Sequence, residues 1–390
     1  MHCFLWMNVL FIVFKTCFLL GWISFGGPAA HIGYFRNTFV EKLKWLDDQE
    51  YAQIVALSQF IPGPGSSQVG FAIGYKKHGL MGACLAFIGF TLPSVLLMLI
   101  LAVLSSQLTD TSTFQQIIHG LKLLAVVVVA DACWGMYKSF CKDTITVGLC
   151  FFTAIALWLV SGILPQIMVL VIAALIGLKY LSENTNPLTE KSNISTIPFI
   201  IFVGLLFGLP LLGEYSTSIK VFSDFYQGGS LVFGGGHVVL PLLQNILGEQ
   251  VTQDTFLTGY AAAQAVPGPM FTFATYLGFH LLPSTPLVGA LLATLAVFLP
   301  GFLLLLTVLN NWHKLANHPK LSGVVAGVNA SVVGLLFSAL YNPVFANAVF
   351  NTVDIALVGT GWYLFKQLKV SIMWLVAFFI ISGLVVGLFV

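Results

Sequence analysis

Three long stretches of this chain contain no charged side chain: residues 80–104, 286–309 and 371–390. Leu, Ile, Phe, Val and small residues dominate each of them. A helix needs roughly 20 apolar residues to cross the hydrocarbon core of a bilayer. Because backbone polar groups in lipid must be satisfied within the segment, such stretches predict spanning helices and not open strands. The chain is therefore expected to be an all-α integral membrane protein.

Composition agrees with this prediction. Of the 390 residues, 58% are apolar and only 8% are charged, whereas a soluble chain is about 25% charged. A secretory signal is the alternative for the first apolar run, 4–25, but the run lacks a basic start and leads into a Gly-Gly-Pro motif. We expect it to be a helix of the mature protein. The lipid bilayer is the expected partner, and no nucleic acid is expected.

The chain repeats a series of landmarks at an offset of 205 to 208 residues. The first series is Phe25-Gly26-Gly27-Pro28, Gln59-Phe60-Ile61-Pro62-Gly63-Pro64, Thr91-Leu92-Pro93-Ser94 and Gly120. The second is Phe233-Gly234-Gly235-Gly236, Gln264-Ala265-Val266-Pro267-Gly268-Pro269, Phe298-Leu299-Pro300-Gly301 and Gly327. Four ordered matches at one offset indicate a duplication. We predict a first repeat over 1–181, a linker over 182–217 and a second repeat over 218–390.

Each repeat is expected to contain the same elements. These are a first helix (4–25; 218–243), two short segments broken by Pro-Gly-Pro (49–61 and 66–76; 254–266 and 269–281), two long helices (80–104 and 116–138; 286–309 and 322–341) and a final pair (144–160 and 162–180; 345–365 and 371–390). The prediction is about ten spanning helices plus two re-entrant hairpins. The linker stretch 198–212 is 15 residues long, so we expect it to be tilted or partly inserted.

Basic residues predict that the two repeats are inverted relative to each other. Cytoplasmic loops carry an excess of Lys and Arg. The first repeat has five basic residues between 36 and 77, whereas the matching stretch 244–285 has none. The next loop reverses this bias, since 105–115 has none and 310–321 has two. If 198–212 spans the membrane, however, the repeats become parallel.

The Pro-Gly-Pro motifs are the first candidate binding sites. Two prolines one residue apart end a helix, and Ser66 and Ser67 after the first motif are good helix N-cap residues. A helix N-terminus attracts anions, and duplicated broken helices indicate a transporter site. The candidates at the first break are Pro62, Gly63, Pro64, Gly65, Ser66 and Ser67. The alternative is a bend that serves packing alone.

Other polar and glycine residues are weaker candidates. The glycine clusters Gly26-Gly27-Pro28 and Gly234-Gly235-Gly236 could approach a ligand or simply allow close helix packing. His31 and His237 follow them and could contact a proton or an anion, or be hydrogen-bonded only. Residues 34–48 resemble an interfacial helix.

Charged residues form a further set of candidates. Arg36, Lys76 and Lys77 could form a basic mouth that concentrates anions, or serve topology alone. Lys122 and Asp131 lie within a predicted span, where ionisable residues indicate function. They are nine residues apart, on opposite faces, so they are not expected to pair. Asn329 aligns with Lys122.

Several chemistries lack their motifs. The sequence has no P-loop, HExxH or GxSxG motif, and its six cysteines include no CxxC pair. We therefore expect no ATP hydrolysis, no metal site, no cofactor and no enzyme. Gradients or membrane potential would have to drive transport.

The motifs quoted above resemble those of the chromate ion transporter family, in its long form with two homologous domains in one chain. The resemblance covers about 8–180 and 218–390. It implies a plasma (inner) membrane protein that exports chromate, a tetrahedral dianion. The residues it places along the anion path are Gly26, Gly27, Pro28, Gln59, Pro62, Gly63, Pro64, Gly234, Gly235, Gly236, Gln264, Pro267, Gly268 and Pro269. The second repeat departs from the first in lacking basic residues around its motif and in having Met270 in place of Gly65.

The expected function is therefore secondary transport of a divalent oxyanion, with chromate efflux first. A sulfate or other anion exchanger and an anion channel remain alternatives. A membrane-embedded enzyme would need a catalytic constellation that the sequence does not contain. A homodimer is one oligomeric state that the sequence leaves open.

Overall fold

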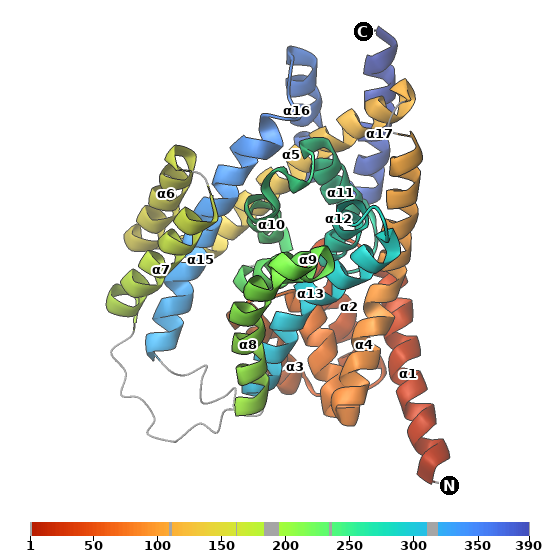
Figure 1. The fold of residues 1–390 in the computed structure, drawn as a ribbon, viewed down its shortest axis with the longest axis vertical. Coiled ribbons are helices and arrows are strands. Elements are labelled where there is room, and N and C mark those ends of the chain that lie inside the picture. The colour runs from red at the N-terminus through yellow and green to blue at the C-terminus, as the bar shows by residue number, and fades with distance from the viewer. Residues whose placement is uncertain are drawn as a thin grey trace. The chain divides into compact units, whose positions relative to one another are not determined.

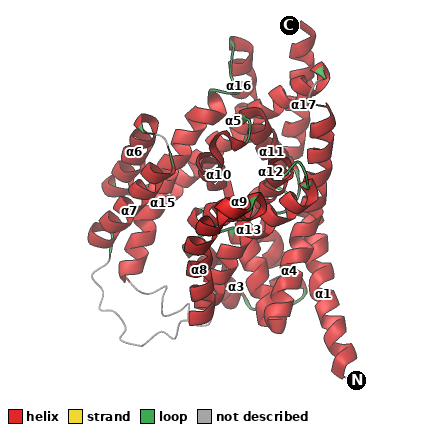
Figure 2. Ribbon diagram, in the orientation of Figure 1, coloured by secondary structure: helices red, strands yellow, loops and turns green. Residues whose placement is uncertain are grey.

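The computed structural model describes residues 2–108, 111–160, 162–182, 195–233, 236–309 and 319–389. Helices joined by short loops make up this part of the chain, with no strand in it, so the all-α prediction is confirmed (Figures 1 and 2). The α-helices are α1 (His2–Ile23), α2 (Gly27–Phe35), α3 (Asp48–Phe60), α4 (Gly65–Leu108), α5 (Ser112–Phe140), α6 (Thr144–Leu159), α7 (Ile163–Tyr180), α8 (Thr196–Leu212), α9 (Thr217–Leu231), α10 (Val239–Leu247), α11 (Gln253–Ala265), α12 (Phe273–Leu281), α13 (Pro286–Val308), α15 (Pro319–Ala339), α16 (Thr352–Lys366) and α17 (Ile372–Phe389).

The chain forms two compact units, and each unit takes segments from both halves of the sequence. Unit 1 comprises residues 1–100, 191–236 and 266–315, and unit 2 comprises 101–190, 237–265 and 316–390. The repeats predicted over 1–181 and 218–390 therefore do not correspond one to one with the units.

Unit 1 is built around α1, α4, α9 and α13. Helix α13 packs against α8, α9 and α12. The core of unit 1 contains aromatic side chains that are almost fully buried, among them Phe35, Phe90, Phe225 and Phe298. Burial of rings of this size contributes strongly to stability.

Unit 2 repeats one helix contact at the sequence offset of the duplication. Helix α5 packs against α17, and α15 packs against α6 and α7. Gly120 of α5 lies against the backbone of α17, and its counterpart Gly327 of α15 lies against the backbone of α7. A side chain at either glycine would collide with that backbone, so both glycines allow close helix approach. Figure 1 draws α5 and α15 with opposite chain directions.

The prediction of one helix over 218–243 is wrong. Helix α9 ends at Leu231, and α10 begins only at Val239 after a 3-10 turn at Gly236–Val238. The first repeat behaves in the same way, because α1 ends at Ile23 and α2 begins at Gly27. Glycine-rich sequence lowers the cost of leaving the helix, and in both halves the first helix ends shortly before the glycine cluster.

In the part of the chain that the structure describes, five helices are long and apolar enough to cross a membrane: α4, α5, α8 with its following turn, α13 and α15 with its following turn. Shorter apolar helices occur at Val9–Ile23, Thr144–Leu159, Leu164–Tyr180 and Ile372–Gly387. The linker segment is longer than the sequence indicated, since its helix and turn cover Thr196–Tyr215, 20 residues. None of its most apolar window is buried in the protein. The fold is that of a multi-pass membrane protein.

Candidate functional site

The first Pro-Gly-Pro break is held by the broken end of helix α9. Helix α3 ends at Phe60, and Gly63 has φ of +122° before α4 begins at Gly65. The Gly63 N–H donates a hydrogen bond to the carbonyl oxygen of Val232 at 2.7 Å. Val232 is the residue that directly follows α9. The first Pro-Gly-Pro break is therefore hydrogen-bonded to the end of the first helix of the other sequence half.

The second Pro-Gly-Pro break makes the reciprocal bond. Gly268 has φ of +98°, and its N–H donates to the carbonyl oxygen of Ser24 at 2.8 Å. Ser24 directly follows α1. Both prolines of each motif lack an N–H, so the central glycine supplies the donor in each case. Unit 1 thus contains two equivalent backbone hydrogen bonds, and each of them joins a residue of one sequence half to a residue of the other.

The residues after Pro93 and Pro300 complete this cluster. Gly63 packs against Gly301, since a Cβ built on Gly63 would lie 2.9 Å from the Gly301 Cα. Gly268 packs against Ser94 at the equivalent position, where the corresponding distance to the Ser94 Oγ is 2.8 Å. Gln68 joins the two halves again, because its Nε2 donates to the carbonyls of Pro62 at 2.9 Å and Gly301 at 3.2 Å.

The N-terminus of α4 is buried in this cluster. The first helical bond runs from the Gln68 N–H to the Pro64 carbonyl at 2.9 Å, so the amides of the three preceding residues have no partner within the helix. Ser66 and Ser67 are 3% and 2% exposed. The helix that starts here runs to a kink at His78 and Gly79, and its N-terminus provides a partial positive charge inside the protein.

Among the described residues of unit 1, four buried polar side-chain atoms have no hydrogen-bond partner. They are the hydroxyls of Ser24, Ser67 and Thr91 and the side-chain oxygen of Gln68. Contacts connect Ser24 with Thr91, because Ser24 bonds Gly268, Gly268 packs on Ser94, and the Ser94 hydroxyl donates to the Thr91 carbonyl at 2.9 Å. Buried polar groups are nearly always paired. An unpaired group of hydroxyl donors beside a helix N-terminus suits an anion.

His31 links two parts of the cluster. Its Nε2 lies 3.0 Å from the Ser24 carbonyl, which can only accept, so Nε2 is the donor. Its Nδ1 lies 3.1 Å from the Ser66 hydroxyl. The ring packs edge-on against Phe90 and is fully buried. Both ring nitrogens are occupied within the protein.

The remaining motif residues lie in different surroundings. Gln59 is exposed, as is Gly26, while Gly27 and Pro28 are half-buried. Gly234 and Gly235 lie outside the described residues, and Gly236 packs against Met270 and Phe271.

After the second break the chain forms a 3-10 turn at Met270–Thr272 instead of an immediate α-helix. Pro267, Gly268 and Pro269 are all buried. His237 and Gln264 belong to unit 2, where the His237 Nδ1 lies 2.9 Å from the Tyr260 hydroxyl.

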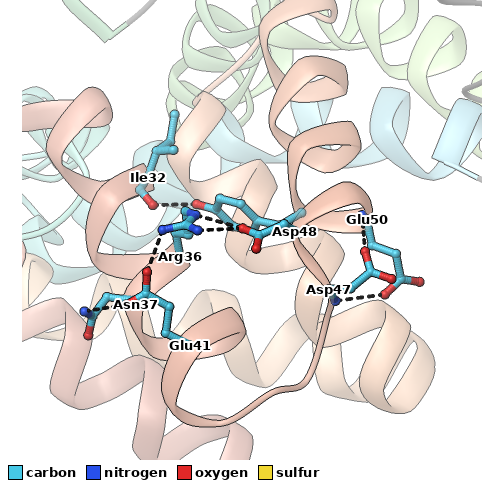
Figure 3. A network of polar contacts seen from close by, with 8 residues as sticks. Ile32, Arg36, Asn37, Glu41, Asp47, Asp48 and Glu50 are labelled. Atoms are coloured by element: carbon cyan, nitrogen blue, oxygen red, sulfur yellow. Dashed lines mark hydrogen bonds and ion pairs between the residues drawn. The ribbon is translucent and has the colours of Figure 1, made fainter.

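The predicted basic mouth contains its own counter-charges. Arg36 lies between Glu41 and Asp48, with nitrogen–oxygen distances of 2.5 and 2.8 Å (Figure 3). The hydrogen bond that Arg36 donates to the Asp48 carboxylate raises the pKa of Arg36 above its usual value. Lys76 pairs with Glu50 at 3.1 Å. The expected interfacial segment is a π-helix over Arg36–Lys42, which contains Glu41. Asp48 and Glu50 come from the acidic first turn of α3.

Lys77 is the third basic residue of the predicted mouth. Its ammonium lies 5.3 Å from the centre of the Trp45 ring. At this distance the ring face attracts the cation. Lys77 is therefore held by a ring, whereas Arg36 and Lys76 are held by carboxylates.

The charged residues of α5 pair separately within unit 2. Lys122 binds Asp254 of α11 at 2.5 Å, and Asp131 pairs with Lys366 of α16. Asn329 is 5% exposed, and its side-chain oxygen has no partner. Among the residues that the structure describes, no group of three or more His, Cys, Asp or Glu side chains could hold a metal ion.

Sequence reasoning missed Ser24, Gln68, Thr91 and Ser94 as site residues. Thr91 and Ser94 stand in the repeated landmark that was used only for alignment, so the signal was present. Ser24 directly precedes the glycine cluster, and Gln68 follows the two serines. Polar residues adjacent to a duplicated break were the available indication.

Comparisons with known proteins agree with the duplicated motifs. A sequence model described as "Chromate transporter" matches residues 11–178 and again 219–387. An uncharacterized transporter of Methanocaldococcus jannaschii is 27% identical over 335 residues, covering 83% of this chain and 82% of that protein. A chromate transport protein of Cupriavidus metallidurans is 27% identical over 331 residues, covering 82% and 79%. No solved structure matches the chain.

Proposed function

The chain belongs to the chromate transporter family, and on that premise we propose that it is a secondary transporter that moves chromate out of the cell across the plasma membrane. The glycine and proline breaks of unit 1 would form the oxyanion site. The unpaired buried hydroxyls of Ser24, Ser67 and Thr91 carry this proposal.

The chemistry of these groups fits a tetrahedral dianion. Hydroxyl donors and helix N-terminal amides bind anions without placing a fixed positive charge in the membrane. A fixed cation would hold a dianion tightly and slow its release. Neutral donors allow binding and release at the depth of a broken helix, which is where transporters place their sites.

The membrane potential would favour outward movement. An inside-negative potential acts on each elementary charge with about 2.3 kcal/mol per 100 mV. For a dianion this term is doubled. The direction is part of the proposal, as is the absence of ATP hydrolysis.

We also propose that the two repeats are inverted, with about ten spanning helices, which requires that α8 does not span the membrane although it is long enough to do so. The reciprocal Gly63–Val232 and Gly268–Ser24 bonds and the opposite directions of α5 and α15 support a two-fold relation between the halves. Labelling of Lys44→Cys and Gln250→Cys from either side of the membrane tests it. Labelling of both from the same side contradicts inversion.

The transport proposal is tested with purified protein in liposomes. We expect saturable efflux of chromate from liposomes that are loaded with it. This efflux should increase when the interior of the liposomes is made negative. Competition by unlabelled sulfate measures whether sulfate shares the site. Flux that rises linearly with chromate and never saturates would indicate a channel, and absence of chromate flux contradicts the proposal.

A further inference from the structure

Unit 2 contains a polar cavity of about 260 Å³. It lies among the α6–α7 turn, helix α10 and the C-terminal end of α15, and its polar lining includes Trp158, Gln166, Gln244, Asn245, Ser338 and Asn342. None of the described residues that line it is charged. The oxyanion site proposed above uses none of these residues.

Two amide side chains in the cavity are oriented by one carbonyl. The Asn245 Nδ2 donates to the Pro241 carbonyl oxygen at 3.0 Å, and the Gln166 Nε2 donates to the same oxygen at 3.4 Å. A carbonyl can only accept, so each amide must turn its NH₂ group toward Pro241 and its oxygen away. Each amide therefore keeps its oxygen as an acceptor and one further N–H.

Gln166 supplies the observation that indicates a ligand. The residue is 2% exposed, and its side-chain oxygen has no partner. A buried acceptor without a donor costs about 1–3 kcal/mol. A bound species that accepts no hydrogen bond but attracts oxygen, such as a cation, would remove this cost.

One helix end adds further acceptors. Gln244 and Asn245 lie in the last turn of α10, which ends at Leu247. The final carbonyls of a helix carry partial negative charge. Helix α15 adds no such end, because its backbone continues into a π-helix at Leu340–Phe345. The first turn of α7 also lines the cavity and acts in the opposite sense, but Pro165 in that turn has no N–H.

The opening of the cavity is acidic. A second cavity of about 450 Å³ shares Gly162, Gln244 and Asn245 with the first and includes Glu249 in its lining. A carboxylate at a mouth raises the local concentration of cations. Calcium would require carboxylate ligands and transition metals would require His or Cys, whereas the inner cavity offers neutral oxygens. A monovalent ion fits this set.

We propose that this cavity is a binding site for a monovalent cation, with Na⁺ as the ion it accepts. The side-chain oxygens of Gln166 and Asn245 bind it, beside the C-terminal end of α10. Exchange of this Na⁺ for the oxyanion would rest on the proposed transport function. Binding of Na⁺ to the cavity does not depend on that function.

Binding of ²²Na⁺ to the purified full chain, in choline buffer without oxyanion, tests the site. We expect saturable binding that unlabelled Na⁺ displaces. Gln166→Leu should weaken it about tenfold, because it removes one ligand at similar volume. Gln166→Glu should strengthen it at neutral pH by adding a charge. Gln367→Leu, at the exposed C-cap of α16, is the control and should bind as the native chain does.

Size-exclusion profiles identify any variant that fails to fold. If Gln166→Leu does not fold, the Na⁺ affinity of Gln166→Glu tests the site in its place. Unchanged Na⁺ affinity in a folded Gln166 variant overturns the proposal. So does saturable binding of ³⁵S-sulfate that Gln166→Leu abolishes, since that result makes the cavity an anion site. Intact Na⁺ binding in a chain without chromate flux contradicts the proposed function and leaves this site standing.

Discussion

The two Pro-Gly-Pro breaks share one backbone arrangement and differ in their side chains. Gly63 and Gly268 both have positive φ, and both donate to the carbonyl that follows the first helix of the opposite half. The first break leads directly into α4 with two buried serines, whereas the second leads through Met270 and Phe271 into a short turn. Backbone symmetry therefore supports the fold, whereas the unpaired side-chain atoms differ: those of Ser67 and Gln68 lie at the first break, and Ser24 and Thr91 are connected to the second break through Gly268 and Ser94.

Substitution of Gly63 should have the largest effect. In Gly63→Ala the added Cβ meets backbone of Gly301 at 2.9 Å, and the positive φ adds about 1–2 kcal/mol of strain. We expect a lower melting temperature and chromate flux reduced more than about tenfold. Thermal unfolding in detergent and liposome flux measure the two effects. A Gly63→Ala protein with native stability and native flux would show that the contact is dispensable.

Gly268→Ala should be less severe, because the added Cβ would come within 3.0 Å of the Ser94 hydroxyl but not of any backbone atom, whereas a Cβ at Gly63 also meets the Gly301 backbone at 2.9 Å. Combining it with Ser94→Gly removes that side chain and should restore part of the lost melting temperature. Gly63→Ala has no such rescue, since Gly301 already lacks a side chain. Equal stability of Gly268→Ala with and without Ser94→Gly contradicts the proposed contact.

Two hydroxyl substitutions separate binding from folding. Ser67→Ala removes an unpaired hydroxyl, so we expect an unchanged melting temperature and a chromate KM raised about tenfold. Thr272→Val removes a hydroxyl that donates to the Pro269 carbonyl at 2.8 Å, so it should lower stability by about 1 kcal/mol and leave KM unchanged. The reverse pattern would place the oxyanion at the second break.

The smallest effect is expected at the basic mouth. Arg36→Gln and Lys76→Gln remove charges that already pair with carboxylates at the surface. Such pairs contribute little and are screened by salt, so chromate KM should change less than about twofold. A KM that rises severalfold at low salt and recovers at high salt would show instead that the mouth steers anions.

Much of the helix content followed from local sequence. The uncharged run 80–104 lies within α4, and the run 286–309 matches α13 except for its last residue, because hydrophobic length acts over neighbouring residues. The single helix expected over 218–243 failed, because the apolar pattern continues past Leu231, where helix α9 ends. The linker helix was underestimated, because its start at Thr196 and its final turn at Tyr215 are polar in sequence.

The sequence by itself determined that this chain is an all-α membrane protein with a duplicated set of broken helices. Composition, motif offset and family motifs are properties of the chain read in order. Only the tertiary structure decided which residues the breaks meet. The Gly63–Val232 and Gly268–Ser24 bonds join residues in opposite halves, and the unpaired oxygen of Gln166 emerges only when α7 meets α10. Such contacts depend on topology, because no local pattern encodes which distant carbonyl a glycine N–H will face.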